Sequence, residues 1–148
     1  MKRILAFFIL MVVIVACGKD KVETKPSLKF KSFSSNVLPA NGRLEVILEF
    51  TDQEGDLDSL YVKRQRLNRR GMSVIDFRYS GIPAFGNQNR GELAVSFEVQ
   101  SELIFNLPAI GSVGNFEADT LQLGFYVKDK EGNFSDTAIT SPVIVIRN

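Results

Sequence analysis

Apolar and polar residues alternate with a period of two along much of the chain after residue 27. The clearest run is 43–51, where every second residue is apolar: Leu44, Val46, Leu48 and Phe50. Side chains on a β-strand point alternately to the two faces of a sheet, so this period predicts strands with one face in a core. No stretch of twelve residues beyond residue 16 has a convincing helical period.

Similar apolar runs, separated by turn signals such as Asn41-Gly42 and Glu131-Gly132-Asn133, recur to the end of the chain. Seven strands are expected, at 28–34, 43–51, 59–67, 72–79, 92–100, 119–128 and 136–147. Short strands at this spacing predict an all-β fold, a single β-sandwich of about seven antiparallel strands.

Two segments are similar to the Ig-like and cadherin-like modules of bacterial envelope proteins. They are EFTDQEGDLDSL, residues 49–60, and LGFYVKDKEGNFSDTAIT, residues 123–140. The second contains a D-x-x-G-N-x-S turn, formed by Asp129, Gly132, Asn133 and Ser135. This resemblance implies an Ig-like domain over residues 28–148.

The chain begins with a layout typical of an export signal. Lys2 and Arg3 precede thirteen apolar residues, 4–16, which is fewer than the roughly 20 that a membrane-spanning helix needs. We therefore expect residues 1–16 to be a signal helix that is removed. A buried core segment or a short anchor helix is the alternative. Removal of this signal would take away Lys2 and Arg3, two of the 18 basic residues. The remaining 16 basic and 17 acidic residues give a net charge of −1.

The four residues Ile14-Val15-Ala16-Cys17 resemble the lipobox of bacterial lipoproteins. The resemblance implies that the Cys17 thiol receives a diacylglyceryl group and that cleavage occurs just before it. Residues 17–27 are then a lipidated cysteine and a polar tether. The expected location is the bacterial outer membrane, held by the lipid anchor and facing the periplasm or the cell surface.

Composition excludes several functions. The chain has no histidine, which rules out Ser-His and Cys-His nucleophilic sites, and its single cysteine cannot form an internal disulfide. The formal net charge of +1 gives no reason to expect nucleic-acid binding. We expect that the protein is not an enzyme and needs no cofactor, with Ca²⁺ as the one candidate ligand ion.

The Ca²⁺ candidates are acidic residues in two turns that a sandwich places at the same end: Asp52, Glu54, Asp56, Asp58, Asp129 and Glu131, with Asp136 nearby. Ca²⁺ prefers six to eight oxygen ligands, and alternate acids with a glycine can supply them. The alternative is turn chemistry, because Asp and Asn side chains also close turns by bonding to their own backbone.

Two further stretches are candidates for binding. The segment 78–91 contains Tyr79, Phe85 and Asn87, and aromatic rings beside amides suit a sugar or a peptide, although the same side chains could pack on the core. A basic stretch could face anionic glycans or lipid headgroups, or be a solvated sheet face. Its members are Lys63, Arg64, Arg66, Arg69 and Arg70.

The sequence therefore predicts a lipid-anchored cell-envelope protein that displays an Ig-like binding or structural module. Its partner would be an envelope protein or a glycan. The alternatives are a Ca²⁺-stabilised adhesion module and a glycan-processing enzyme that works through a pair of carboxylates.

Overall fold

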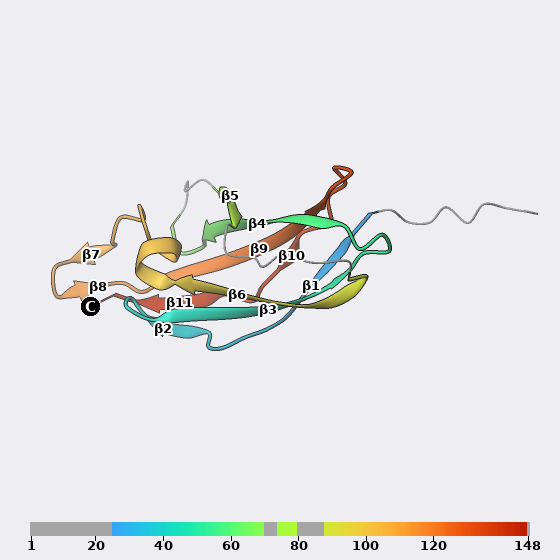
Figure 1. The fold of residues 1–148 in the computed structure, drawn as a ribbon. Coiled ribbons are helices and arrows are strands. Elements are labelled where there is room, and N and C mark those ends of the chain that lie inside the picture. The colour runs from blue at the N-terminus through green and yellow to red at the C-terminus, as the bar shows by residue number, and fades with distance from the viewer. Residues whose placement is uncertain (1–24, 70–73, 80–87, 148) are drawn as a thin grey trace, which may run out of the picture.

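The computed structural model describes residues 25–69, 74–79 and 88–147, which form two β-sheets packed face to face (Figure 1). The predicted all-β, Ig-like sandwich is confirmed. The expected signal, Cys17 and most of the tether lie outside the described residues. In the part of the chain that is described, no helix has the length and apolar character needed to cross a membrane.

The small sheet has the order β1-β3-β6. Its strands are β1 (Ser27–Phe33), β3 (Arg43–Thr51) and β6 (Arg90–Glu98). The large sheet has the order β2-β11-β9-β4-β5, and β10 also pairs with β9. Its strands are β2 (Val37–Pro39), β4 (Leu57–Arg66), β5 (Ile75–Tyr79), β9 (Asp119–Asp129), β10 (Ala138–Ile139) and β11 (Val143–Ile146). A small hairpin joins β7 (Gly111–Ser112) to β8 (Asn115–Phe116).

The core lies between the two sheets and follows the predicted alternation. Leu44, Val46 and Leu48 of β3 are fully buried, and so are the alternate apolar residues of β9. Phe97 of β6 and Phe125 of β9 meet across the sandwich, with ring centroids 6.2 Å apart. Removing these apolar side chains from water is the main favourable contribution to folding, at about 1.5–3 kcal/mol for each large one.

Besides the β7–β8 hairpin, which was not predicted, the structure differs from the predicted strands in three places. Strand β2 was not predicted, and it pairs in parallel with β11, so the large sheet is mixed rather than wholly antiparallel. The expected strand 136–147 is divided into β10 and β11, because Pro142 between them has no N–H to donate to a ladder. A π-helix, η1 (Val99–Leu103), follows β6, and it buries Val99 and Leu103 four residues apart.

Two arginines of the predicted basic stretch are buried, which corrects its interpretation as a solvated face. Arg64 and Arg66 point to the core side of β4 and are 5% and 3% exposed. Arg64 donates hydrogen bonds to the carbonyls of Glu102 and Leu103, at 2.9 and 2.8 Å. Burial is possible because these carbonyls, at the end of η1, accept the guanidinium's protons.

Arg66 belongs to a buried ion cluster with Asp119 and Arg147. The Asp119 carboxylate is fully buried and forms salt bridges with both guanidinium groups. Arg66 also donates to the carbonyl of Pro108, at 2.7 Å, and Arg147 to that of Leu107, at 2.9 Å. The cluster therefore connects the segment after η1 to β4 and to the last residues of the domain.

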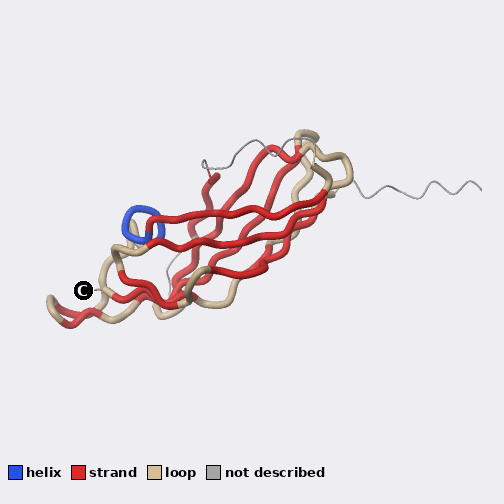
Figure 2. Tube along the Cα trace, turned by 60° about the horizontal axis from the view of Figure 1, so that its bottom comes forward, coloured by secondary structure: helices blue, strands red, loops and turns tan. Residues whose placement is uncertain are grey.

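The two ends of the sandwich differ in what they carry. The first described residues and the β3–β4 loop lie at one end, whereas β11 ends near the β7–β8 hairpin at the other (Figure 1). The hairpin extends beyond the sheets (Figure 2). We call the first end the acidic pole, after the carboxylates of residues 52–56 and 129–131, and the second the hairpin pole.

Replacing Asp119 by Ala should destabilise the domain strongly, because it leaves two buried guanidinium groups without their carboxylate. The expected loss is about 3–5 kcal/mol in the free energy of unfolding, measured by urea denaturation. Asp58→Ala is the control, because Asp58 faces Arg78 at 3.7 Å on the surface and its loss should change stability by about 0–1 kcal/mol. Equal effects for the two variants would contradict the role assigned to the cluster.

Candidate functional site

The loop between β3 and β4 forms one half of the acidic pole. Asp52 directly follows β3 and is 2% exposed, and its Oδ2 accepts the backbone N–H of Asp56, at 2.8 Å. Gly55 lies between them with φ of 67°, a left-handed conformation that glycine adopts without steric cost. The Asp-rich sequence therefore closes this loop on its own side chain, as turn chemistry predicts.

The turn after β9 forms the other half. Asp129 is 1% exposed, and its two carboxylate oxygens accept the backbone N–H of Asn133, at 2.7 Å, and the Asn133 side-chain amide, at 2.8 Å. Gly132 has φ of 99° and permits the reversal. The backbone N–H of Lys130 donates to the carbonyl of Asp56, at 3.1 Å, so the two turns are joined.

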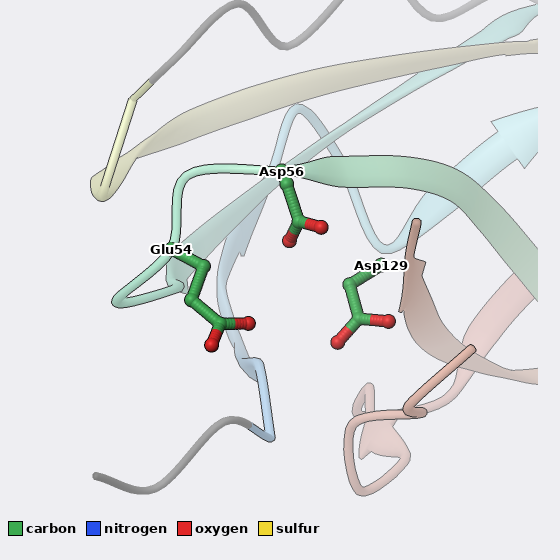
Figure 3. A group of neighbouring side chains, drawn as sticks. All are labelled: Glu54, Asp56 and Asp129. Atoms are coloured by element: carbon green, nitrogen blue, oxygen red, sulfur yellow. The ribbon is translucent and has the colours of Figure 1, made fainter. Parts of the chain in front are cut away.

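Three carboxylates from these turns converge on one point. Glu54, Asp56 and Asp129 each place one oxygen within 4.8 Å of the others, and Figure 3 shows their side chains approaching one another. The pKa of Glu54 is raised above its ordinary value, first by desolvation and then by repulsion from nearby carboxylates. These are Glu131, Asp56, Asp52 and Asp129. The pole thus concentrates negative charge that no described cation neutralises in a salt bridge.

Two oxygens at this pole are buried without a hydrogen-bond donor. They are Oδ1 of Asp52 and Oδ1 of Asp56. A buried carboxylate oxygen without a partner is costly, and a bound cation is one of the standard reasons for its presence. These two unpartnered oxygens, together with the three converging carboxylates, make the acidic pole a candidate metal centre.

Five of the six residues that the sequence suggested for Ca²⁺ therefore lie near one another. The sixth, Asp58, is on β4, where its carboxylate faces Arg78 and accepts the hydroxyl of Ser59. Asp136 lies at the same pole, where it lines a hollow together with Asp52, but it is not one of the converging carboxylates and forms a salt bridge of 2.6 Å with Lys25.

Of the residues suggested for ligand binding, Tyr79 is described, whereas Phe85 and Asn87 lie outside the described residues. The Tyr79 hydroxyl donates to the carbonyl of Ser96, at 2.7 Å, and accepts its N–H, at 3.2 Å. The Tyr79 ring packs edge-on against Phe97, with centroids 5.3 Å apart. Its hydroxyl and one side of its ring are thus engaged within the fold.

The outer face of the large sheet carries an aromatic cluster that the sequence analysis did not single out. Tyr61 of β4 and Tyr126 of β9 are cross-strand partners, with rings stacked 4.9 Å apart. Phe134 tilts against both rings, at 6.0 and 5.8 Å, and is 45% exposed. The alternation in the sequence does indicate that both tyrosines point outward, because each occupies a position between the buried apolar residues of its strand.

A hollow lies beside this cluster, where Gly124 faces Lys63 across the β4–β9 pair. Its volume is about 130 Å³, and it is lined mainly by Lys63, Gln65, Val74, Gln122, Thr137 and Ile139. A side chain at position 124 would fill it, because a Cβ there would come within 2.8 Å of Cγ2 of Thr137. We call this hollow and the three rings together the outer aromatic face.

The architecture defines an Ig-like β-sandwich, and the sequence matches no protein-family model and none of the curated proteins.

Similar solved structures include a Niemann-Pick type C2 protein from Japanese carpenter ant, which is 14% identical to this chain, with a TM-score of 0.46. The match covers 88% of this chain and 96% of the ant protein's chain. Spo0M, a sporulation control protein from Bacillus subtilis, is 8% identical to this chain, with a TM-score of 0.49. The match covers 82% of this chain and 49% of the Spo0M chain. The CARDB domain of the PF1109 protein from Pyrococcus furiosus, solved in complex with di-metal ions, has 12% identity, coverage of 84% and 94%, and a TM-score of 0.37.

The Tyr126 phenol should ionise well above the ordinary range for tyrosine. Burial, followed by its hydrogen bond to Asp76, raises its pKa to about 12. Because the folded pKa is raised, the stability this group contributes is complete below about pH 10 and is lost as the pH rises through 12. The difference between the phenolate absorbance titrations of the wild type and Tyr126→Phe measures this pKa.

Asp76→Asn should lower the pKa of Tyr126 only in part, because burial is the larger cause. Asp58→Asn is the control and should leave the titration unchanged. An ordinary tyrosine titration for Tyr126 in the wild type would contradict the described contact with Asp76.

Proposed function

We propose that this protein is a lipid-anchored, non-catalytic binding module of the bacterial cell envelope. The observation that carries the proposal is the lipobox-like segment ending at Cys17, which precedes an Ig-like sandwich whose first strand starts at Ser27. The thiol at Cys17 is the group that a lipoprotein lipidates, and several acyl chains on one residue give firm membrane attachment.

The position of the tether supports display of the domain away from the membrane. The described chain enters the sandwich at the acidic pole, where Lys25 is held by Asp136. At the opposite, hairpin pole, Val113 is 93% exposed and Phe105 is 60% exposed. A domain anchored through its N-terminus therefore presents the hairpin pole and the sides of the sandwich to other molecules.

The arrangement of carboxylates favours binding over catalysis. A glycosidase needs one carboxyl group that can donate a proton and a second that can attack the sugar or activate water. Here Asn133 already donates to both oxygens of Asp129, and Oδ2 of Asp52 accepts the backbone N–H of Asp56. The carboxylates of the acidic pole thus close turns and face one another.

Metabolic labelling with palmitate tests the anchor. The wild-type chain should incorporate label and fractionate with membranes, and Cys17→Ala should lose both properties. Gly18→Ala is the control, because it changes the next residue and keeps the thiol. Equal labelling of Cys17→Ala and the wild type would remove the basis for a lipid anchor.

We also propose that the acidic pole binds Ca²⁺, which makes the protein a Ca²⁺-stabilised module. The unpartnered oxygens of Asp52 and Asp56, beside the converging carboxylates, favour this second function. The described donors are oxygens alone, and such a set suits a hard cation rather than Zn²⁺, which prefers nitrogen and sulfur. Waters and backbone carbonyls of the two turns would complete the coordination.

The raised pKa of Glu54 gives the same expectation from electrostatics. A carboxyl whose pKa is raised by folding stabilises the folded state at low pH, and this contribution is lost as the pH rises through its folded pKa. At neutral pH the ionised group therefore opposes folding. A divalent cation reverses this effect, because it stabilises the charged form and joins the β3–β4 loop to the turn after β9.

Thermal unfolding with Ca²⁺ and with chelator tests the site. For a dissociation constant of about 0.1–1 mM, typical of extracellular modules, roughly 10 mM Ca²⁺ should raise Tm by about 5–10 °C. Glu54→Gln should raise Tm in chelator and, like Asp56→Asn, reduce the gain from Ca²⁺. Asp58→Asn is the matched control and should keep the full gain. Identical melting of the wild type in both conditions would rule out the site.

A further inference from the structure

We propose that the outer aromatic face binds an anionic saccharide, that is, a sugar unit carrying a carboxylate or a sulfate. This inference rests on the proposed function as a binding module and names the chemistry of its partner. It is independent of the acidic pole, because it concerns the exposed side of the large sheet.

The hollow at Gly124 gives the face a concave centre. Its volume of about 130 Å³ is below the 300–1,000 Å³ typical of pockets for drug-sized ligands, so it suits one small ring rather than a large molecule. Val74 and Ile139 are apolar and are 49% and 60% exposed. Lys63, which leans over the Tyr126 ring at 4.8 Å, connects the hollow to the aromatic cluster.

Polar groups around the hollow have unused hydrogen-bonding capacity. The side chains of Gln65 and Thr137 make no hydrogen bond within the described part of the chain, and Gln122 makes one long contact of 3.4 Å with the carbonyl of Thr140. The Tyr61 hydroxyl likewise has no partner among the described residues. Amides and hydroxyls beside apolar surface match a sugar, which has hydroxyl groups at its rim and C–H groups on its faces.

The charges on this face favour an anionic sugar. Lys63 and Lys128 form no salt bridge with any described carboxylate, and their ammonium groups lie over the rings of Tyr126 and Phe134. Of the nearby acids, Asp58 faces Arg78, and Asp76, the cross-strand partner of Lys63, accepts the Tyr126 hydroxyl and keeps its negative charge. The two ammonium groups therefore still exceed the carboxylates that lack an ion-pair partner by one positive charge. Two ammonium groups without carboxylate partners, one beside the hollow and one beside the rings, are complementary to a negatively charged ligand.

The backbone beneath this face argues against a peptide bound by strand addition. Strand addition requires an edge with free N–H and C=O groups. The face is built on β4, which pairs with β5 and β9, and on β9, which pairs with β4, β10 and β11. A ligand on this face can therefore be bound only by side chains. A saccharide is bound in this way, whereas an extended peptide that adds to a sheet also requires free backbone groups.

Binding of polygalacturonate oligomers to the full chain in detergent micelles tests the proposal, with fully methyl-esterified oligomers as the uncharged control. Heparin oligomers test sulfate in place of carboxylate. Lys63→Gln with Lys128→Gln should weaken binding of at least one anionic oligomer by about tenfold and reduce its salt dependence. The matched control is Lys29→Gln with Lys31→Gln on β1, which makes the same change in net charge on the other sheet.

A second variant tests the hollow without altering charge. Gly124→Ala alone would strain the fold, since its Cβ would meet Cγ2 of Thr137 at 2.8 Å. Gly124→Ala with Thr137→Ser removes that methyl group and raises the floor of the hollow. This double variant should melt like Thr137→Ser alone and bind the oligomer at least several-fold more weakly.

Three outcomes would overturn the proposal. The first is no binding of either anionic oligomer. The second is equal weakening by the two lysine pairs, which would mean general electrostatic attraction. The third is equal binding of a control ligand. Equal binding of the esterified oligomer would show that the charge of the sugar does not contribute to recognition, and equal binding of polyglutamate would show that the sugar itself does not. Palmitate labelling is unaffected by these variants, so failure here is distinguishable from failure of the anchor.

Discussion

The register of β4 against β9 is the constraint on which the rest of the structure depends. It pairs Leu57 with Asp129, and so brings the two turns of the acidic pole together. It also pairs Tyr61 with Tyr126 and Lys63 with Gly124, which creates the outer aromatic face. Because side chains alternate between faces, a slip of one residue would exchange the core and solvent faces of β4. One register therefore sets the core, the candidate metal centre and the candidate saccharide site.

Much of the fold could be predicted because burial on one face imposes a period of two. Strands β3, β6 and β9 were expected close to their observed bounds, and burial alternates along each of them except at two glycines, Gly91 and Gly124. Strand β2 is three residues long and η1 is a five-residue π-helix, and segments this short carry too little pattern to be recognised. Val99 and Leu103 keep the parity of Leu93, Val95 and Phe97, so the strand period conceals the start of the helix.

The candidate sites were predictable to different degrees for physical reasons. Turn acids cluster in sequence, so Asp52, Glu54 and Asp56 were visible, and the sandwich brought Asp129 to them. The orientation of Asp58 was not visible, because it depends on a register shift between Leu57 and Ser59. Arg64 and Arg66 were misread because charge normally indicates solvent, whereas these two guanidinium groups find carbonyl and carboxylate acceptors in the interior. The stacking of Tyr61 on Tyr126 was not visible either, because it depends on the register that makes them cross-strand partners.

The contact between Tyr79 and Ser96 has a consequence for solubility. Strand β6 is at the edge of the small sheet, and the exposed N–H and C=O groups of an edge strand can template pairing with another chain. The Tyr79 hydroxyl occupies both backbone groups of Ser96 from across the gap between the sheets. One phenol group thus closes the side of the sandwich and blocks intermolecular β-pairing at this position.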